Sequence, residues 1–303
     1  MVKKKFLPSK KTLGDKKSTS SIILCVCLIF YCLILFTPIV WSCVASFMTP
    51  DSFMNVFEYR DLSALREYTF DNFAYAWNNI EIIREGVSYK IGGLFLNSII
   101  YSVGCAVMIT LCPCIVGYAA SRFKFKFSSV IYLFVIIAMA LPIVGASASE
   151  LKLLDALHLR STTFSTFIAM FILRFNFMGI NFLLFHAQFE SIPKDYTESA
   201  KIDGASNFRI MTRVIVPQAK NTIITVFILS FIMYWNDFQI PFLYMPNTPT
   251  VSYAVYDISQ SSTYFADVPR ALAGIILLTL PIVILFILIN RKIRVSVDMG
   301  GIK

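Results

Sequence analysis

Long apolar runs separated by polar connectors dominate the sequence. The runs cover residues 21–47, 92–119, 128–147, 162–187, 222–244 and 271–290. The hydrocarbon core of a bilayer is about 30 Å thick, and a helix needs roughly 20 apolar residues to cross it. A segment in lipid must satisfy its own backbone hydrogen bonds, so each run is expected to be helical. The pattern predicts an all-α, polytopic membrane protein with six transmembrane helices.

Composition and charge agree with a membrane protein and predict its orientation. The 303 residues are 57% hydrophobic and only 15% charged, with a mean hydropathy of +0.69. The net charge of +9 does not indicate nucleic-acid binding, because Lys and Arg gather beside the apolar runs, as they do in cytoplasmic loops. Nineteen of the 27 Lys and Arg residues fall in one alternating set of connectors and seven in the other. This excess predicts that both termini are cytoplasmic.

The runs and connectors divide the chain into segments with different expected surroundings. They are a basic cytoplasmic tail (1–20), the first transmembrane helix (21–47), an extracytoplasmic loop (48–91), a core with five transmembrane helices and a cytoplasmic loop at 188–221 (92–290), and a cytoplasmic C-terminal tail (291–303). The first apolar run is too long for a cleaved signal sequence, so we expect it to be retained. The extracytoplasmic loop, rich in acidic and aromatic residues, is either a surface cap or a docking surface for an external partner.

The sequence carries no pattern typical of catalysis, of a metal site or of a bound cofactor. It has no G-x-x-x-x-G-K-[ST], G-x-S-x-G or H-E-x-x-H motif. Its two histidines, His158 and His186, lie far apart, and its seven cysteines fall within the first two apolar runs. Cys112-Pro-Cys114 has no histidine nearby in the sequence, and buried thiol packing explains it better than a metal. We therefore expect no catalytic residue, no metal and no cofactor.

The connector after the fourth run differs from the others because it is polar and helix-prone. Ser191 can cap a first helix. That helix is expected to end at Gly204, since glycine is best suited to the left-handed turn that follows a helix. Ser206 or Asn207 can cap a second short helix, and Pro217 marks either its end or the entry into the next run.

The second short helix has an apolar and a charged side. Phe208, Met211 and Ile215 are expected to share one face. The polar side of the two helices carries both signs of charge, on Glu198, Lys201, Asp203, Arg209 and Arg213. One interpretation is an interfacial helix that rests on lipid headgroups. Such a helix is more often uniformly basic, so the mixed charge and the glycine bend favour a protein partner.

The same stretch resembles the EAA loop of ATP-binding-cassette (ABC) importer permeases, whose pattern is E-A-A-x3-G-x9-I-x-L-P. Here the chain reads Glu198-Ser199-Ala200, then Gly204 after three residues, then Val214-x-Val216-Pro217 after nine more. Residues 118–123, 203–205, 235–238 and 300–303 resemble the carbohydrate-uptake branch and, within it, the smaller, maltose-type permease subunit. The resemblance covers roughly residues 90–303.

This resemblance implies a type I ABC importer permease fold in a bacterial plasma membrane. It implies three kinds of partner: a second homologous permease subunit, two ATP-binding ATPase subunits that hydrolyse the ATP, and an external solute-binding protein that delivers sugar. Closure of the ATPases would pull on the EAA loop and open the pore outward. The residues expected to couple to the ATPase are Glu198, Ala200, Asp203, Gly204, Phe208, Arg209 and Pro217.

Polar residues inside the fourth and fifth runs are candidates for a translocation pathway. They are Arg174, Asn176, Asn181, Trp235, Asn236 and Asp237. A mid-bilayer arginine costs about 2.5–3.5 kcal/mol on insertion scales, so Arg174 is expected to face a cavity or a partner, with Asp237 as a counter-charge. The group either lines a sugar-permeable pore or joins helices to one another. The competing function is a stand-alone secondary transporter or channel, which would be expected to have inverted repeats with broken helices in corresponding positions of the two halves. Six runs with one long cytoplasmic connector do not show such repeats.

Overall fold

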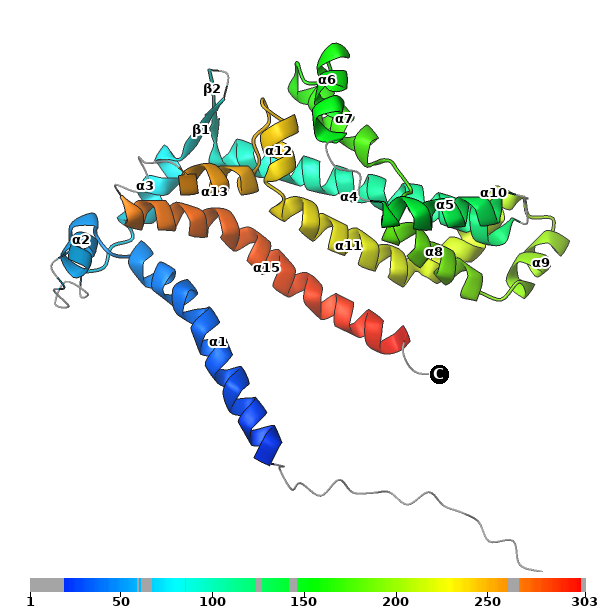
Figure 1. Ribbon diagram of the computed structural model, residues 1–303, viewed down its shortest axis with the longest axis horizontal. Helices are drawn as coiled ribbons and strands as arrows, with labels where there is room; N and C mark the ends of the chain where they lie inside the picture. The colour runs from blue at the N-terminus through cyan, green and yellow to red at the C-terminus, as the bar shows by residue number, and fades with distance from the viewer. Residues whose placement is uncertain are drawn as a thin grey trace, which may run out of the picture.

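The computed structural model describes residues 19–58, 60, 67–84, 86–123, 127–141, 146–260 and 267–300, and these are almost entirely helical (Figure 1). In chain order the elements are α1 (Thr19–Ser46), α2 (Pro50–Glu58), α3 (Asp71–Asn79), β1 (Glu81–Arg84), β2 (Val87–Lys90), α4 (Ile91–Arg122), α5 (Ser128–Ala140), α6 (Ala146–Ala156), α7 (Thr163–Arg174), α8 (Ile180–Ser191), α9 (Asp195–Ile202), α10 (Asn207–Ile210), a π-helical turn (Met211–Ile215), a 3-10 turn (Val216–Ala219), α11 (Lys220–Asn236), α12 (Gln239–Tyr244), α13 (Val251–Gln260) and α15 (Val268–Gly300).

Three helices in the described part of the chain are long and apolar enough to cross a membrane. By length and composition they are Ser21–Ser46, Ile91–Arg122 and Asn207–Asn236, the last of which joins α10 and α11 into one rod. Shorter apolar helices are Ser128–Ala140, Thr163–Arg174 and Val268–Ile284. Each predicted run therefore contains helix. Of the prolines expected inside spans, Pro38, Pro113 and Pro281 lie within helices, and Pro142 lies outside the described residues.

Helix α4 forms the centre of the fold and packs against α11, α8 and α7. Gly117 lets α8 approach closely, because a Cβ at this position would lie 3.0 Å from Phe185 Cβ and 3.2 Å from the backbone nitrogen of His186. Gly104 makes room in the same way for the ring of Phe171 on α7. Small residues at such crossings are typical of helix packing in membranes.

Two predicted transmembrane helices are broken. The run 162–187 is interrupted between α7 and α8, where Gly179 has a φ of 148°. The run 222–244 is interrupted between α11 and α12, where the Asp237 carboxylate accepts hydrogen bonds from two N–H groups of α12. A side chain that bonds the local backbone competes with continuation of a helix. The apolar pattern predicted each run as one continuous helix, although polar residues stand at both breaks, among them Arg174 and Asn176 at the first and Asn236 and Asp237 at the second.

The segment between α1 and α4 is folded and adds a β-hairpin to the predicted all-α architecture. β1 and β2 pair antiparallel, from Glu81 opposite Lys90 to Arg84 opposite Val87. Ile82 on β1 is buried in a cluster with residues of α3, α4, α13 and α15. The hairpin and α3 therefore pack on the helical core instead of forming an open loop.

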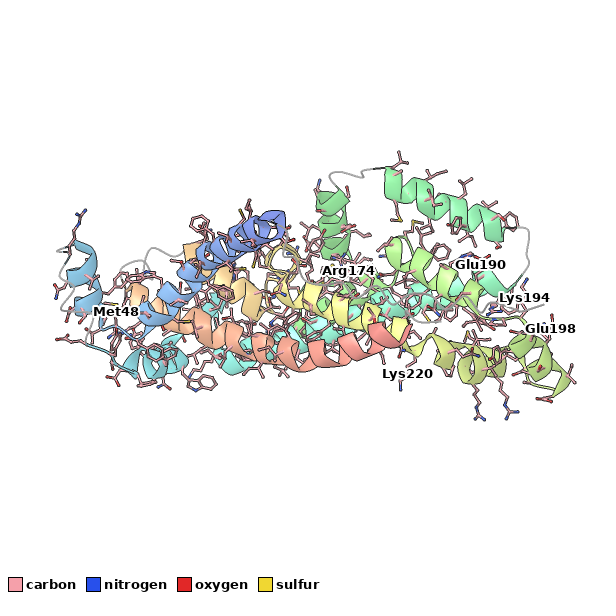
Figure 2. All side chains as sticks on the ribbon, turned by 90° about the horizontal axis from the view of Figure 1, so that it is seen from below. Met48, Arg174, Glu190, Lys194, Glu198 and Lys220 are labelled. Carbon is pink, nitrogen blue, oxygen red and sulfur yellow. The ribbon has the colours of Figure 1, made fainter. Side chains whose placement is uncertain are left out.

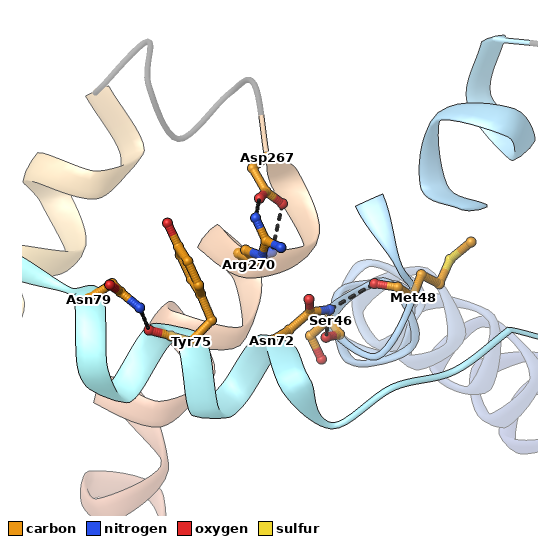
Figure 3. A network of polar contacts seen from close by, with 7 residues as sticks. All are labelled: Ser46, Met48, Asn72, Tyr75, Asn79, Asp267 and Arg270. Atoms are coloured by element: carbon orange, nitrogen blue, oxygen red, sulfur yellow. Dashed lines mark hydrogen bonds and ion pairs between the residues drawn. The ribbon is translucent and has the colours of Figure 1, made fainter. Parts of the chain in front are cut away.

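Polar contacts fix this segment to the ends of two long helices. The buried Asn72 side chain donates hydrogen bonds to the carbonyls of Ser46 at 2.9 Å and Met48 at 2.7 Å, at the end of α1 (Figure 3). The guanidinium of Arg270, at the start of α15, lies 4.3 Å from the ring centroid of Tyr75 on α3. Helix α3 is thus held between α1 and α15.

Candidate functional site

The turn between α9 and α10 is a Schellman motif built on Gly204. Gly204 has a φ of 76°, and its N–H donates to the carbonyl of Lys201 at 3.0 Å. The N–H of Ala205 donates to the carbonyl of Ala200, also at 3.0 Å. These bonds satisfy the last carbonyls of α9, and glycine takes the left-handed position without a steric penalty. The predicted helix end at Gly204 is confirmed, with α9 itself ending at Ile202.

The start of α9 differs from the prediction. Ser191 is the last residue of α8, and its Oγ donates to the carbonyl of Gln188 at 2.7 Å. Helix α9 begins at Asp195, with Lys194 at the N-cap and no side-chain cap bond. The predicted cap at Ser191 is wrong because α8 continues beyond the apolar run that predicted it.

The second half of the loop starts as predicted, and of the two positions considered for Pro217 the structure has the entry into the next run. Ser206 is the N-cap of α10, and its Oγ accepts a hydrogen bond from the N–H of Arg209 at 3.4 Å. The helix does not stop near Pro217, because the π-helical and 3-10 turns carry it directly into α11. The second half of the loop is therefore continuous with α11, in a helix that is long and apolar enough to cross a membrane.

The π-helical turn also changes which side chains of this half are buried. Such a turn adds a residue to the helix and rotates the faces on either side of it. Ile210 and Ile215 are buried against α4 and α8, with Met211 partly buried beside them. Phe208, expected on the same face as Met211 and Ile215, is 71% exposed. That part of the prediction is wrong.

The outer surface of the loop combines exposed apolar side chains with charges. Ile202 is 87% exposed and Phe208 is 71% exposed. Figure 2 places Glu198 and Lys194 at the end of the molecule opposite Met48. Of the predicted coupling residues, the exposed ones are Glu198, Asp203, Gly204, Phe208, Arg209 and Pro217, while Ala200 is half-buried. Large apolar side chains exposed among charges are typical of a surface that binds another protein.

Contacts with α4 and α8 hold the loop in place. Arg122, at the end of α4, donates from Nη2 to the carbonyl of Ile192 at 2.7 Å. Tyr118, one turn earlier, packs edge-on against the ring of Phe189 on α8, with the centroids 5.6 Å apart. Residues 118–123 entered the sequence analysis only as a family-like motif, so this anchoring role was missed. The exposed Ile202 was also missed, although it is an isolated apolar residue on a polar helix.

Arg174 is placed differently from its predicted position in mid-span. It is the last residue of α7, next to the helix break, and its guanidinium carbon lies 5.8 Å from the ring centroid of Tyr234 on α11. Its Nε is buried without a hydrogen-bond partner among the described residues. The expected direct ion pair with Asp237 is not among the salt bridges of the described residues.

Asp237 instead organises the break between α11 and α12. Its Oδ1 accepts from the N–H groups of Gln239 at 3.0 Å and Ile240 at 3.2 Å. Its Oδ2 accepts from the hydroxyl of Tyr101 on α4 at 3.3 Å, and its backbone carbonyl accepts from Ser252 Oγ on α13 at 2.7 Å. These contacts join helices, the second of the two roles considered for the polar residues.

The remaining predicted pathway residues line two separate cavities. Asn176 and Asn181, near the α7–α8 break, line a partly open cavity of about 360 Å³ whose other walls include side chains of α4 and α11. Trp235 and Asn236 line a second cavity, of about 300 Å³, between α11, α13 and α15. The predicted set is therefore divided over three places: the Asp237 junction near Arg174, and these two cavities.

Comparison with known proteins supports a transport role. The chain is 27% identical over 280 residues to the diacetylchitobiose uptake system permease protein of Streptomyces coelicolor, covering 90% of this chain and 86% of that protein. It is 27% identical to the probable starch degradation products transport system permease protein of Thermoanaerobacterium thermosulfurigenes, covering 69% of this chain and 75% of that protein. It is 23% identical to the arabinooligosaccharides transport system permease protein of Bacillus subtilis, covering 78% and 79%. These relatives confirm the resemblance to carbohydrate-uptake permeases.

The fold and a family model agree with these relatives. The fold matches a chain of a bacterial ABC transporter involved in the import of the acidic polysaccharide alginate, with a TM-score of 0.71 and 17% identity over 92% of this chain and 98% of that chain. The model of the family described as binding-protein-dependent transport system inner membrane component matches residues 113–294, more than half of the sequence. The apolar helices, the ABC importer permease fold and this match lead to one conclusion: the chain belongs to the family of binding-protein-dependent transport system inner membrane components.

Proposed function

We propose that the chain is one permease subunit of an ATP-driven importer that takes up a sugar or an oligosaccharide. The sugar-related names of its relatives support the substrate class. A second homologous permease subunit completes the pore, and an external solute-binding protein delivers the sugar. ATP is hydrolysed by two separate ATPase subunits, so this chain is not itself an enzyme. It crosses a bacterial plasma membrane six times, with both termini in the cytoplasm.

The observation that carries this proposal is the exposed, anchored loop from α9 to α10. Ile202 and Phe208 project from it beside charged side chains and bind in a cleft of the ATPase. Gly204 lets the ATPase surface approach the backbone, since no side chain intervenes. The loop continues into α11 and is bonded to α4 through Arg122. When ATP closes the ATPase pair, the loop moves with it, and α4 and α11 change the pore from inward-facing to outward-facing.

Affinity purification of the tagged full chain from its native membrane in mild detergent tests this proposal. We expect a second polytopic permease and an ATPase to co-purify. Recovery of the chain alone, or only as a homo-oligomer, would overturn it.

Substitutions in the loop show whether the association uses this surface. Ile202→Ser and Phe208→Ser remove exposed apolar side chains, and we expect each to reduce the recovered ATPase by about tenfold, the effect of losing about 1.4 kcal/mol of binding free energy. Phe164→Ser is the matched control, because Phe164 is 76% exposed at the start of α7. Equal ATPase recovery from all three variants would assign the contact to another surface.

A stand-alone secondary transporter remains the second candidate. The two helix breaks, at α7–α8 and at α11–α12, favour it, because discontinuous helices line the substrate sites of many such transporters. Uptake into proteoliposomes that contain only this chain separates the two functions. Transport driven by an ion gradient without ATP would favour the second candidate, and transport that requires both the ATPase and ATP would exclude it.

A further inference from the structure

A cavity of about 300 Å³ lies where α11, α13 and α15 meet, next to the α11–α12 break. Figure 1 shows α13 beside α15 and close to α12, and contacts join α13 to α11, α12 and α15. The aromatic and polar side chains that line the cavity are Trp235, Asn236, Phe238, Ser252, Tyr256 and Thr279, and the other lining residues are aliphatic. Ligand sites of proteins start at about this size, so the cavity fits one small ring.

The cavity is built by the helix break and is not a packing defect. If residues 222–244 formed one helix, Phe238 would continue along the axis of α11. Instead Asp237 caps α12 and holds α13 through the bond from Ser252 to its carbonyl, at 2.7 Å. This arrangement brings Phe238 onto Tyr256 of α13, with ring centroids 4.6 Å apart and an interplanar angle of 17°. The stacked pair forms an aromatic wall beside Trp235.

The polar atoms of the lining include both hydrogen-bond donors and acceptors. Asn236 uses one side-chain amide N–H toward the carbonyl of Ile232 at 2.8 Å, which leaves its second N–H and its amide oxygen for a ligand. Ser252 Oγ donates to Asp237, and Thr279 Oγ1 donates to the carbonyl of Ile275 at 2.8 Å. Both hydroxyl protons are thus occupied, and Ser252 Oγ also lies 3.2 Å from Thr250 Oγ1, whose proton takes one of its lone pairs. The remaining lone pairs can accept. A ligand rich in O–H groups satisfies these atoms.

The charge of the cavity narrows the class of ligand. Among the described residues, none of those lining it is charged. Aromatic rings next to a few polar groups suit a ring with one apolar and one hydroxylated side, because C–H groups pack on the electron-rich aromatic face. No lining side chain carries a positive charge that would balance a carboxylate or a phosphate, and an acyl chain leaves the polar groups unused. A neutral pyranose has both required features.

We propose that this cavity is a subsite for one ring of a neutral sugar, with Phe238 and Tyr256 as the platform and Asn236, Ser252 and Thr279 as acceptors for its hydroxyl groups. The choice of a sugar rests on the proposed import function. The chain then contacts its cargo directly, in addition to coupling transport to ATP. Only one ring fits, so the rest of an oligosaccharide extends out of the cavity.

Tryptophan fluorescence of the full chain in lipid nanodiscs tests this subsite. The chain has three tryptophans, and Trp41→Phe with Trp77→Phe leaves Trp235 as the reporter. The probes are maltose, cellobiose and N,N′-diacetylchitobiose, with glucuronic acid as the charged control. We expect a saturable change with at least one neutral disaccharide and none with glucuronic acid.

Two variants locate the response. Tyr256→Ala removes half of the platform, and we expect at least a tenfold weaker response. Thr279→Val keeps the size of the side chain but removes an acceptor, and we expect a threefold to tenfold loss, the usual effect of one hydrogen bond. Phe164→Ala, at the exposed start of α7, is the control and should bind as the parent does.

The outcomes separate this subsite from the import function. No saturable response to any neutral disaccharide, or an unchanged response in both cavity variants, overturns the subsite. If brominated phospholipid quenches Trp235 and sugar does not relieve this quenching, the sugar subsite is overturned in favour of a site for an acyl chain. The ATPase co-purification described above is read separately. Sugar binding without an ATPase refutes the importer but leaves the subsite, and ATP-driven uptake without sugar binding refutes the subsite alone.

Discussion

Substitution of Gly204 by asparagine separates two roles of this glycine. One role is conformational, because Gly204 has a φ of 76° in the Schellman turn. The other is proximity, because the proposed ATPase contact needs a surface without a side chain. Asparagine adopts left-handed conformations far more readily than other non-glycine residues, so it preserves the turn while adding bulk.

The structure limits the effect of this change on the chain itself. A Cβ built at Gly204 meets no atom within 4 Å, so the substitution causes no clash inside the chain. The backbone cost of a left-handed conformation is about 1–2 kcal/mol for an ordinary side chain such as alanine, and less for asparagine. We therefore expect Gly204→Asn to insert and fold normally, whereas sugar uptake falls by at least tenfold. Gly204→Glu adds more bulk and a charge, and we expect a loss at least as large.

Gly86 provides a matched control in the hairpin turn. It has a φ of 79°, and a Cβ built there also meets no atom within 4 Å. Gly86→Asn therefore places asparagine in the same left-handed backbone conformation, but at a position outside the loop. The assay is ATP-dependent sugar uptake by the assembled transporter in proteoliposomes, with thermal unfolding in detergent as the test of folding. If Gly204→Asn transports as well as Gly86→Asn, the loop backbone is not at a close contact, and this reasoning is refuted.

Three further predictions concern packing, capping and anchoring. Gly104→Ala places a Cβ 2.1 Å from Phe171 Cε1, so we expect the stability measured in detergent melts to fall by about 1–3 kcal/mol. Adding Phe171→Leu should recover part of this loss. An unchanged melting temperature would contradict this packing. Asp237→Ala removes the side chain that caps α12 and should lower the stability by about 1 kcal/mol in the same assay. Asp237→Asn should retain most of the stability. Equal losses in the two variants would rule out capping as the cause. Arg122→Gln removes the charged hydrogen bond to the carbonyl of Ile192. We expect amide hydrogen exchange in α9 to become faster, because the free energy of local opening falls by about 1.5–3 kcal/mol. Unchanged exchange would exclude this anchor.

The sequence predicted those features that depend on hydrophobicity and on residues with special backbone preferences. Length and hydropathy predicted that the apolar runs are helical, and the structure has helices in them. Gly204 marked the turn, since glycine is common at the left-handed position after a helix. Ser206 marked the next helix start because its hydroxyl suits an N-cap.

Features that depend on tertiary contacts could not be predicted in this way. The π-helical turn at Met211–Ile215 exposes Phe208, and no local propensity signals it. The cavity that contains Trp235 and Asn236 includes α13 and α15, which are remote in sequence from α11. Arg174 and Asp237 were expected to pair because both are charged and intramembrane. In the structure Arg174 lies over the ring of Tyr234, and Asp237 accepts a hydrogen bond from the hydroxyl of Tyr101.

The two groups of predicted site residues are connected through the same rod. Helix α11 begins as the continuation of the loop and ends at Asp237, where the cap of α12 and the bond from Ser252 hold α13. A displacement of the loop therefore reaches the proposed sugar subsite through one helix, without passing through a flexible connector. Trp235 and Asn236 lie on the last turn of that helix, and the cavity between α11 and α15 would change if the two helices moved relative to each other. On the proposed function, the helix break therefore places the proposed sugar subsite at the end of the element that the ATPase is proposed to move.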